Sequence, residues 1–334
     1  MTGTFLLCLT LFSAPVAAGP LSFDDSPRMN QIQVIGTHNS YHKRPPSLKL
    51  TAAITPEAMD WDYEHEPLNV QLDNTVRSFE LDIHNTPEGW QTFHVPFVDQ
   101  ESTCRFFKEC LEVVKGWSDA HPGHVPISFL IEHKDEGPMV NPAITMPKAE
   151  DLDRLDAEIR AVFPPERLIT PDDVRGDFAT LEEAVLTRGW PTLESARGKV
   201  FFIFHETGEL RDLYALDRPS LQGRAMFVNS RPGRADAAAM VRDNPDDPET
   251  PDLVRKGYWV RVTAGNPGRR GLEAAEARRD RALANGAQIV SSDYVPGTPH
   301  PATGYKAALP EGGPARWNPV NPPADTTAPP EPAL

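Results

Sequence analysis

Short apolar runs alternate with longer amphipathic segments along the chain, and this alternation constrains the fold more than any other feature. Several of the runs are apolar at consecutive positions, which is typical of parallel strands that are covered on both faces. We predict strands at residues 31–36, 77–83, 126–132, 199–205, 224–228, 258–262 and 287–291. Residues 91–95 are either an eighth strand or the return arm of a hairpin.

The segments between these runs have the period of amphipathic helices. Residues 151–163 place Leu152, Leu155 and Ile159 on one stripe, residues 106–117 form a similar stripe, and residues 272–283 form a weaker one. A repeated strand–helix alternation predicts an α/β protein with a (β/α)8 TIM-type barrel, irregular or with one weak strand. An open doubly wound sheet is the alternative.

Residues 1–18 have the pattern of a secretory signal peptide. An uncharged apolar run at residues 5–12 is followed by small residues at 16–18, and Ser13 and Pro15 make the run too short to span a membrane. No Lys or Arg precedes the run, which departs from the usual pattern. We therefore expect a secreted or periplasmic protein.

Two cysteines remain after the leader, which itself contains Cys8. Cys104 and Cys110 are close in sequence, and in an oxidising compartment they can close a small loop as a disulfide. The alternative is two unpaired thiols on a helical turn. A zinc site is disfavoured because no two further ligands stand at suitable spacing.

The charge and the C-terminal composition limit partners and domains. With 48 Asp and Glu against 33 Lys and Arg, the formal charge is −15, which argues against a nucleic-acid partner. Residues 297–334 are rich in Pro and lack apolar periodicity, so we expect a tail that is disordered or lies on the surface. The catalytic barrel is then assigned to residues 19–296, and no obligate protein partner is evident.

Acidic residues stand inside or at the ends of the predicted strands. Glu80 and Asp82 are two residues apart, so their side chains project from the same face of one strand. Buried as bare anions they would be costly, unless a divalent cation neutralises them. Together with Glu132 and the amide oxygen of Asn39 they make a set of hard oxygen ligands that suits Ca²⁺.

Histidines follow the same strands. His38 comes directly after the first strand and His94 follows the Glu80–Asp82 strand, which suggests acid–base chemistry at phosphorus beside the cation. His84 competes with His94 for the second catalytic role, and we prefer His94 from its distance to Asp82 along the chain. The sequence contains no G-x-S-x-G motif and no Gly-rich phosphate loop, so serine-hydrolase and nucleotide-binding functions are disfavoured.

These motifs, taken in order, resemble the catalytic series of the calcium-dependent phosphoinositide phospholipases C. The series runs through VIGTHNSYH, SFELDIH, His94 and the PISFLIE strand, and with the closing IVSSDY it is most similar to the secreted bacterial branch. The similarity covers about residues 30–294.

The resemblance implies a two-step phosphoric diester hydrolysis. The inositol 2-hydroxyl would attack the phosphorus, expel diacylglycerol and leave a cyclic inositol phosphate that water can open. His38 would stabilise the pentacoordinate phosphorane, and His94 would protonate the leaving glycerol oxygen. One of the carboxylates that hold Ca²⁺ would also act as base.

The resemblance also assigns ligands and a partner. The residues implied to hold Ca²⁺ are Asn39, Glu80, Asp82 and Glu132. Lys134 and Arg261 would bind phosphate or inositol hydroxyls. The substrate partner would be a phospholipid at a membrane or micelle interface. The neighbouring aromatic side chains of Trp90, Phe93 and Phe97 would either insert at this interface or pack on the barrel.

Two rival functions remain. A glycerophosphodiester phosphodiesterase shares the barrel and the Glu-x-Asp pair, but such enzymes usually begin with His-Arg-Gly where this chain has His38-Asn39-Ser40. An inactive, secreted calcium-binding module is the rival from another class. It is disfavoured because binding of Ca²⁺ does not require the two histidines.

Overall fold

The computed structural model describes residues 19–332, except 47, 55, 136, 269 and 270. The predicted leader at residues 1–18 lies outside the described residues. Within the described part of the chain, no helix combines the length and the hydropathy that crossing a membrane requires.

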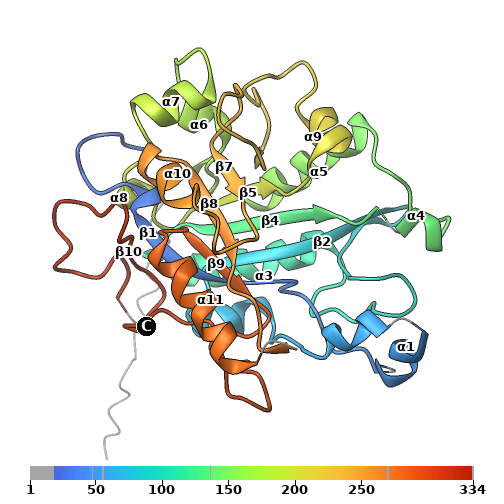
Figure 1. Cartoon of the computed structure of the whole chain (residues 1–334). Coiled ribbons are helices and arrows are strands. Elements are labelled where there is room, and N and C mark those ends of the chain that lie inside the picture. Colours follow the sequence, from blue (N-terminus) through green and yellow to red (C-terminus); the bar gives the residue numbers. More distant parts are fainter. Residues whose placement is uncertain (1–18, 47, 55, 136, 269–270, 333–334) are drawn as a thin grey trace, which may run out of the picture.

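A nearly closed barrel of parallel strands forms the centre of the molecule (Figure 1). The strand order is β6-β5-β4-β2-β1-β9-β8-β7, and a parallel bridge from Asn229 to Ala239 links the two ends of this order. The strands are β1 (Ile32–Thr37), β2 (Ser78–Thr86), β4 (Ile127–His133), β5 (Val200–Phe204), β6 (Met226–Val228), β7 (Ala239–Val241), β8 (Trp259–Thr263) and β9 (Ile289–Ser292). The predicted irregular TIM-type barrel is confirmed.

Helices connect the strands around the outside. The three amphipathic segments of the sequence form α3 (Phe107–Ala120), α5 (Ala149–Val162) and α11 (Leu272–Ala284), which confirms their prediction. The other α-helices are α1 (Leu48–Ile54), α2 (Leu68–Asp73), α4 (Gly137–Val140), α6 (Pro171–Arg175), α7 (Leu181–Thr187), α8 (Leu193–Ala196), α9 (Gly208–Tyr214) and α10 (Thr250–Lys256). Short 3-10 helices are η1 (Met29–Gln31), η2 (Pro56–Trp61) and η3 (Pro165–Arg167).

Residues 91–95 do not supply the eighth barrel strand. β3 (Gly89–Gln91) pairs antiparallel with β2 as the return arm of a hairpin. The eighth barrel strand is β7, which the sequence did not reveal. Its neighbourhood reads DAAAMVRD, where alanines favour helix and a single β-branched residue falls within three strand positions.

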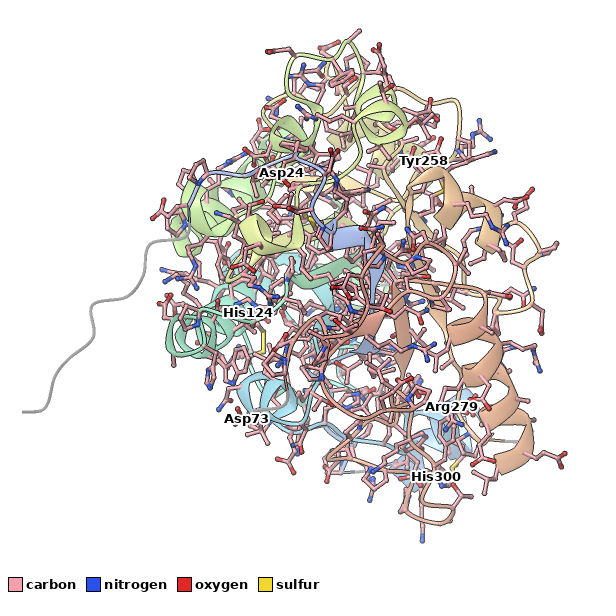
Figure 2. The ribbon with its side chains drawn as sticks, turned by 90° about the vertical axis from the view of Figure 1, so that its left-hand side faces the viewer. Asp24, Asp73, His124, Tyr258, Arg279 and His300 are labelled. Atoms are coloured by element: carbon pink, nitrogen blue, oxygen red, sulfur yellow. A yellow bond between two sulfur atoms is a disulfide. The ribbon has the colours of Figure 1, made fainter. Side chains whose placement is uncertain are left out.

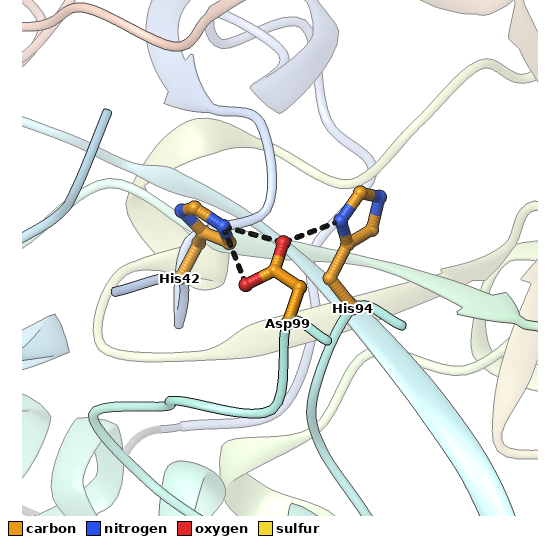
Figure 3. A group of neighbouring side chains, drawn as sticks. All are labelled: His42, His94 and Asp99. Carbon is orange, nitrogen blue, oxygen red and sulfur yellow. Dashed lines mark hydrogen bonds and ion pairs between the residues drawn. The ribbon is translucent and has the colours of Figure 1, made fainter. Parts of the chain in front are cut away.

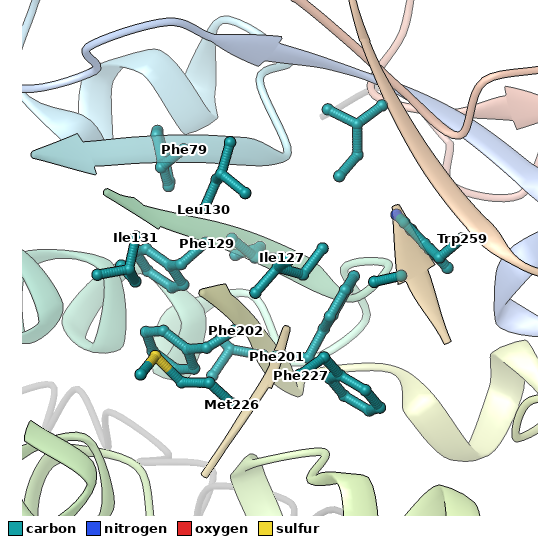
Figure 4. Packing of buried hydrophobic residues seen from close by; sticks show 14 of the residues in the cluster. Phe79, Ile127, Phe129, Leu130, Ile131, Phe201, Phe202, Met226, Phe227 and Trp259 are labelled. Carbon is teal, nitrogen blue, oxygen red and sulfur yellow. The ribbon is translucent and has the colours of Figure 1, made fainter. Parts of the chain in front are cut away.

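Side chains that meet across the barrel interior form an apolar layer below a polar one. β5 and β8 are not neighbours in the sheet, yet the rings of Phe201 and Trp259 lie 4.9 Å apart (Figure 4). Arg261 is two residues further along β8, and its guanidinium bonds Glu80 on the equally distant β2. The apolar layer therefore closes the barrel beneath the acidic residues. On the outer face of the barrel, the rings of Phe129 and Phe202 stack with their centroids 4.6 Å apart.

The C-terminal segment packs against the opposite end of the barrel from α1 and α4 (Figure 1). β10 (Arg316–Trp317) pairs antiparallel with the beginning of β1. Glu331 is 4% exposed and forms a buried ion pair with Arg77, which directly precedes β2. The described part of the segment expected to be a tail is thus joined to the barrel, with parts of it buried.

Candidate active site

A cavity of about 510 Å³ opens near the carboxyl ends of β1 and β9. Its lining includes His38 and Asn39 after β1, Tyr63 after η2, His94 after β3 and Asp293 after β9. Gly36 permits the close approach of β1 and β2, because a Cβ there would lie 3.0 Å from the Cβ of Ser78. The carboxyl ends of barrel strands are where this architecture places active sites.

Three carboxylates converge on this end of the barrel. Glu80 and Asp82 on β2 and Glu132 on β4 each offer an oxygen within 4.8 Å of the others. Asp82 pairs in register with Glu132 on the neighbouring strand, and alternation puts Glu80 on the same face as Asp82. Glu80 and Asp82 are buried, and Glu132 is partly so.

Two cations contact this cluster. The Lys134 ammonium lies 3.1 Å from Asp82 Oδ2 and 2.9 Å from Glu132 Oε1. The Arg261 guanidinium, 4% exposed, bonds Glu80 Oε2 and Asp243. The structure therefore places both residues that were predicted to bind substrate directly on the predicted metal ligands.

Burial and the neighbouring charges shift the pKa values of this cluster in different directions. Burial raises the pKa of the Asp82 carboxyl, and the Lys134 charge offsets this only in part. Burial disfavours the charged form of Glu132 too, but the His205 hydrogen bond and Lys134 hold its pKa below the usual range. Although burial favours a neutral amine, Asp82 and Glu132 raise the pKa of Lys134.

The donor set fits Ca²⁺. Lys134 contacts one oxygen each of Asp82 and Glu132, and Arg261 contacts one oxygen of Glu80. Asp82 Oδ1 and Glu80 Oε1 are bonded to neither of these two cations, and Glu80 Oε1 lies 3.4 Å from His38 Nε2. One oxygen from each of Glu80, Asp82 and Glu132 lies within 4.8 Å of the other two, which is close enough for a single Ca²⁺ to contact all three. The oxygens come from carboxylates, the hard ligands that Ca²⁺ prefers.

The orientation of the Asn39 amide decides whether its oxygen or its nitrogen faces the Asp82 carboxylate. In one orientation Nδ2 donates to Tyr63 Oη at 3.0 Å, which leaves the amide oxygen facing the Asp82 carboxylate. In the other, Nδ2 donates to Asp82 at 3.2 and 3.3 Å. A cation between the two groups favours the first orientation, whereas its absence favours the second. Asn39 also has a left-handed backbone, with a φ of 46°.

His38 lies between two carboxylates. Its Nδ1 is 2.6 Å from Asp293 Oδ1 and its Nε2 is 3.4 Å from Glu80 Oε1, with 38% of the side chain exposed. Burial opposes the charged form, but Glu80 and Asp293 together raise the pKa of His38 to about 9. Sequence reasoning missed Asp293, although its place directly after β9 was a usable signal.

The two candidates for the second histidine have different surroundings. His94 lines the cavity, and its Nδ1 is 2.8 Å from Asp99 Oδ2. His84 is buried, bonds the Phe93 carbonyl through Nε2 at 3.0 Å and stacks on the Phe93 ring at 3.9 Å. Burial lowers the pKa of His84 to about 4. The geometry therefore favours His94 as the residue that can reach a substrate.

The structure around the β2–β3 hairpin tests the expected disulfide and the two alternatives for the aromatic side chains. Cys104 and Cys110 form a disulfide that ties the loop before α3 to its first turns. Trp90 and Phe93 are 3% and 4% exposed, so of the two alternatives for these side chains, packing on the barrel holds and insertion at an interface does not. Phe97 differs, because 67% of it is exposed.

Comparisons with known proteins agree with this geometry. The chain matches the family described as phosphoinositide phospholipase C, Ca²⁺-dependent, over residues 27–91 and 87–319. A Ca²⁺-dependent phosphatidylinositol-specific phospholipase C from Streptomyces antibioticus is 21% identical over 80% of this chain and 95% of its own, with a TM-score of 0.58.

A calcium-dependent phosphoinositol-specific phospholipase C from a Gram-negative Pseudomonas species has a similar structure. It is 19% identical over 91% of this chain and 99% of its own, with a TM-score of 0.57. At these identities the two structures establish the shared fold. A search of curated proteins found no match. The family match covers well over half of the residues.

Proposed function

Because the chain belongs to the family of Ca²⁺-dependent phosphoinositide phospholipases C, we propose that it cleaves phosphatidylinositol to diacylglycerol and inositol phosphate through a cyclic phosphodiester. The observation that supports this most is the meeting of Glu80, Asp82 and Glu132 at the barrel end that carries His38 and His94. Asn39 and these three carboxylates would hold the Ca²⁺ cofactor. When bound, Ca²⁺ supplies positive charge to a phosphate oxygen and to the attacking hydroxyl.

The protein's own side chains move the protons. One carboxylate of the cluster accepts the proton of the inositol 2-hydroxyl as that oxygen bonds to phosphorus. His38, held by Asp293 and Glu80, faces the phosphate and donates hydrogen bonds to the oxygens that gain charge. His94 gives a proton to the glycerol oxygen as its bond to phosphorus breaks.

The cations have different access to a substrate. Lys134 is 16% exposed, and we assign it to a phosphate or inositol oxygen. Arg261 is 4% exposed and already bonded to Glu80, so its position favours orientation of this carboxylate over direct substrate contact. This refines the role expected from the sequence.

The lipid surface would be met by apolar side chains at the rim. Met59 precedes the end of η2, Phe97 follows β3, and Met139 and Met146 follow β4; all are 46% or more exposed. A formal charge of −15 opposes electrostatic capture by anionic lipids, which leaves apolar contact as the driving force. Phe97 also has a left-handed φ of 66°, a conformation that glycine adopts at lower cost. The fold gains little burial from this side chain.

Phosphorus NMR of the products from phosphatidylinositol micelles tests the reaction. We expect the resonance of a cyclic inositol phosphodiester when Ca²⁺ is present, none when EGTA is added, and its return when Ca²⁺ is restored. With glycerophosphoinositol as the substrate, release of glycerol phosphate and free inositol would instead indicate the glycerophosphodiesterase activity. Full turnover in EGTA would refute metal-dependent catalysis.

A further inference from the structure

A buried carboxylate joins two imidazoles beside the cavity (Figure 3). Asp99 Oδ2 lies 2.8 Å from His94 Nδ1 and 2.9 Å from His42 Nε2, and Asp99 Oδ1 lies 3.1 Å from the same His42 nitrogen. Asp99 is 1% exposed and His42 is fully buried. These separations are those of direct hydrogen bonds, so Asp99 bonds His94 Nδ1 and His42 Nε2 directly.

We propose that Asp99, anchored by His42, is the positioning residue that keeps His94 oriented to protonate the leaving group. This inference rests on the proposed function of His94. His94 Nδ1 bonds Asp99, so Nε2 of the same ring lies on the side away from Asp99 (Figure 3). The His94 ring also lines the cavity. The hydrogen bond therefore selects both the ring orientation and the protonated nitrogen.

The proton balance explains why a carboxylate is useful there. Protonated His94 carries hydrogens on both nitrogens, and Asp99 compensates its positive charge. When the phosphorus–oxygen bond to glycerol breaks, the Nε2 proton goes to that oxygen. The neutral ring that remains keeps its hydrogen on Nδ1, bonded to Asp99, and its bare Nε2 can accept a proton from the water that opens the cyclic ester.

The backbone holds Asp99 rigidly. Asp99 and Val95 exchange two backbone hydrogen bonds of 3.0 and 2.9 Å, so the turn between them fixes Asp99 beside His94. Further along, the Thr103 amide donates to the Tyr41 carbonyl at 2.8 Å. This contact ties the Asp99 loop to the segment after β1.

His42 connects this arrangement to the predicted metal ligand. Its ring packs against the Tyr63 ring, with the centroids 4.4 Å apart and the planes tilted by 31°. Tyr63 Oη in turn bonds the Asn39 amide at 3.0 Å. The His42 amide also donates to the Asn39 carbonyl at 2.8 Å. One loop after β1 thereby supports both the oxygen ligand and, through Asp99, the histidine acid.

Two substrates with different leaving groups test the role of Asp99. Phosphatidylinositol expels an alkoxide that needs a proton, whereas the para-nitrophenyl ester of inositol phosphate expels a stable phenolate that does not. For Asp99→Asn we expect kcat on phosphatidylinositol to fall about 100-fold or more, and kcat on the nitrophenyl ester to fall less than about tenfold. The ratio of the two losses does not depend on how much of the variant is folded.

Equal losses on both substrates would overturn the inference, because Asp99 would then support only the fold or the phosphate site. If the wild-type enzyme formed no cyclic inositol phosphate from either substrate, the proposed function itself would fail.

A paired comparison at position 42 extends the test. His42→Gln keeps a donor near the position of Nε2 and should retain activity on phosphatidylinositol within about tenfold, whereas His42→Leu removes the donor and should show the selective loss of Asp99→Asn. Indistinguishable leaving-group ratios for these two variants would refute the anchoring role of His42.

Discussion

Replacement of Glu331 by Gln tests how firmly the C-terminal segment is joined to the barrel. Glu331 accepts hydrogen bonds from Arg77 Nε at 3.1 Å and from Nη2 at 2.5 Å, and its Oε2 accepts the Val125 amide at 2.8 Å. The Arg77 side chain is fully buried. The remaining guanidinium nitrogen, Nη1, bonds two backbone carbonyls at 2.7 Å each.

The expected cost follows from the charge that is left behind. Glu331→Gln keeps the shape and one acceptor oxygen, but it turns an amide group toward the guanidinium and leaves Arg77 as a buried, uncompensated cation. Loss of one partner of a buried pair costs about 3–5 kcal/mol, and the two carbonyl bonds of Nη1 place this case near 3 kcal/mol. The midpoint of unfolding in urea should fall accordingly, while kcat of the folded enzyme at low temperature should not change.

Urea unfolding followed by tryptophan fluorescence measures this difference, and the same segment supplies a matched control. The side chain of Glu311 is 67% exposed and lies 3.8 Å from Arg316, so Glu311→Gln should change the free energy of unfolding by less than about 1 kcal/mol. If Glu331→Gln were as stable as Glu311→Gln, the C-terminal segment would not be part of the folded unit and the reasoning would be wrong.

Further expected outcomes concern acid stability, membrane binding and catalysis. Burial lowers the pKa of His124 (Figure 2) to about 3 from 6.5, so its contribution to stability is complete above pH 6.5 and declines as pH falls toward 3. At pH 5 the loss should be about 2 kcal/mol, and His124→Gln should flatten the pH dependence of unfolding in this window. Phe97→Gly should leave stability within about 1 kcal/mol, because relief of left-handed strain offsets the added chain entropy. The same change should weaken binding to phosphatidylinositol vesicles about tenfold in sedimentation assays, whereas Leu216→Ala, an exposed apolar control, should not. His38→Ala should lower turnover about 100-fold or more with little change in calcium affinity by calorimetry; full activity would contradict its role at the phosphate.

Local sequence patterns predicted most of the barrel because its strands bury both faces. The runs that became β1, β2, β4, β5, β8 and β9 are apolar or β-branched over several positions, so burial alone identifies them. β7 was missed because its segment is dominated by alanines, whereas the equally short β6 lies in a run that was predicted as a strand. β6 and β7 are linked through the bridge from Asn229 to Ala239. The strand state of β7 follows from closure of the ring, which local propensity does not encode.

Residues at strand ends were easier to find than residues held by turns. Glu80, Asp82 and Glu132 stand on strands whose register is set by the barrel, so their meeting could be expected from alternation and strand direction. Asp99 follows a hairpin, and its contact with His94 depends on the short turn that starts at Val95. Apolar periodicity does not predict turn geometry of this kind.

The C-terminal segment shows a different limit. Its composition indicates little ability to form a core, yet a few anchoring groups suffice to order it against an existing surface. Trp317 pairs with Ile32 at the beginning of β1, and Glu331 forms an ion pair with the buried Arg77. Both contacts join residues far apart in sequence, so periodicity within the segment carries no sign of them.

A crystal structure of the enzyme grown with Ca²⁺, with the ion located by its anomalous scattering, tests the central claim most directly. We predict a single ion within about 2.3–2.6 Å of oxygens from Asn39, Glu80, Asp82 and Glu132. An ion bound elsewhere, or no ion in this cluster at saturating Ca²⁺, would contradict the account.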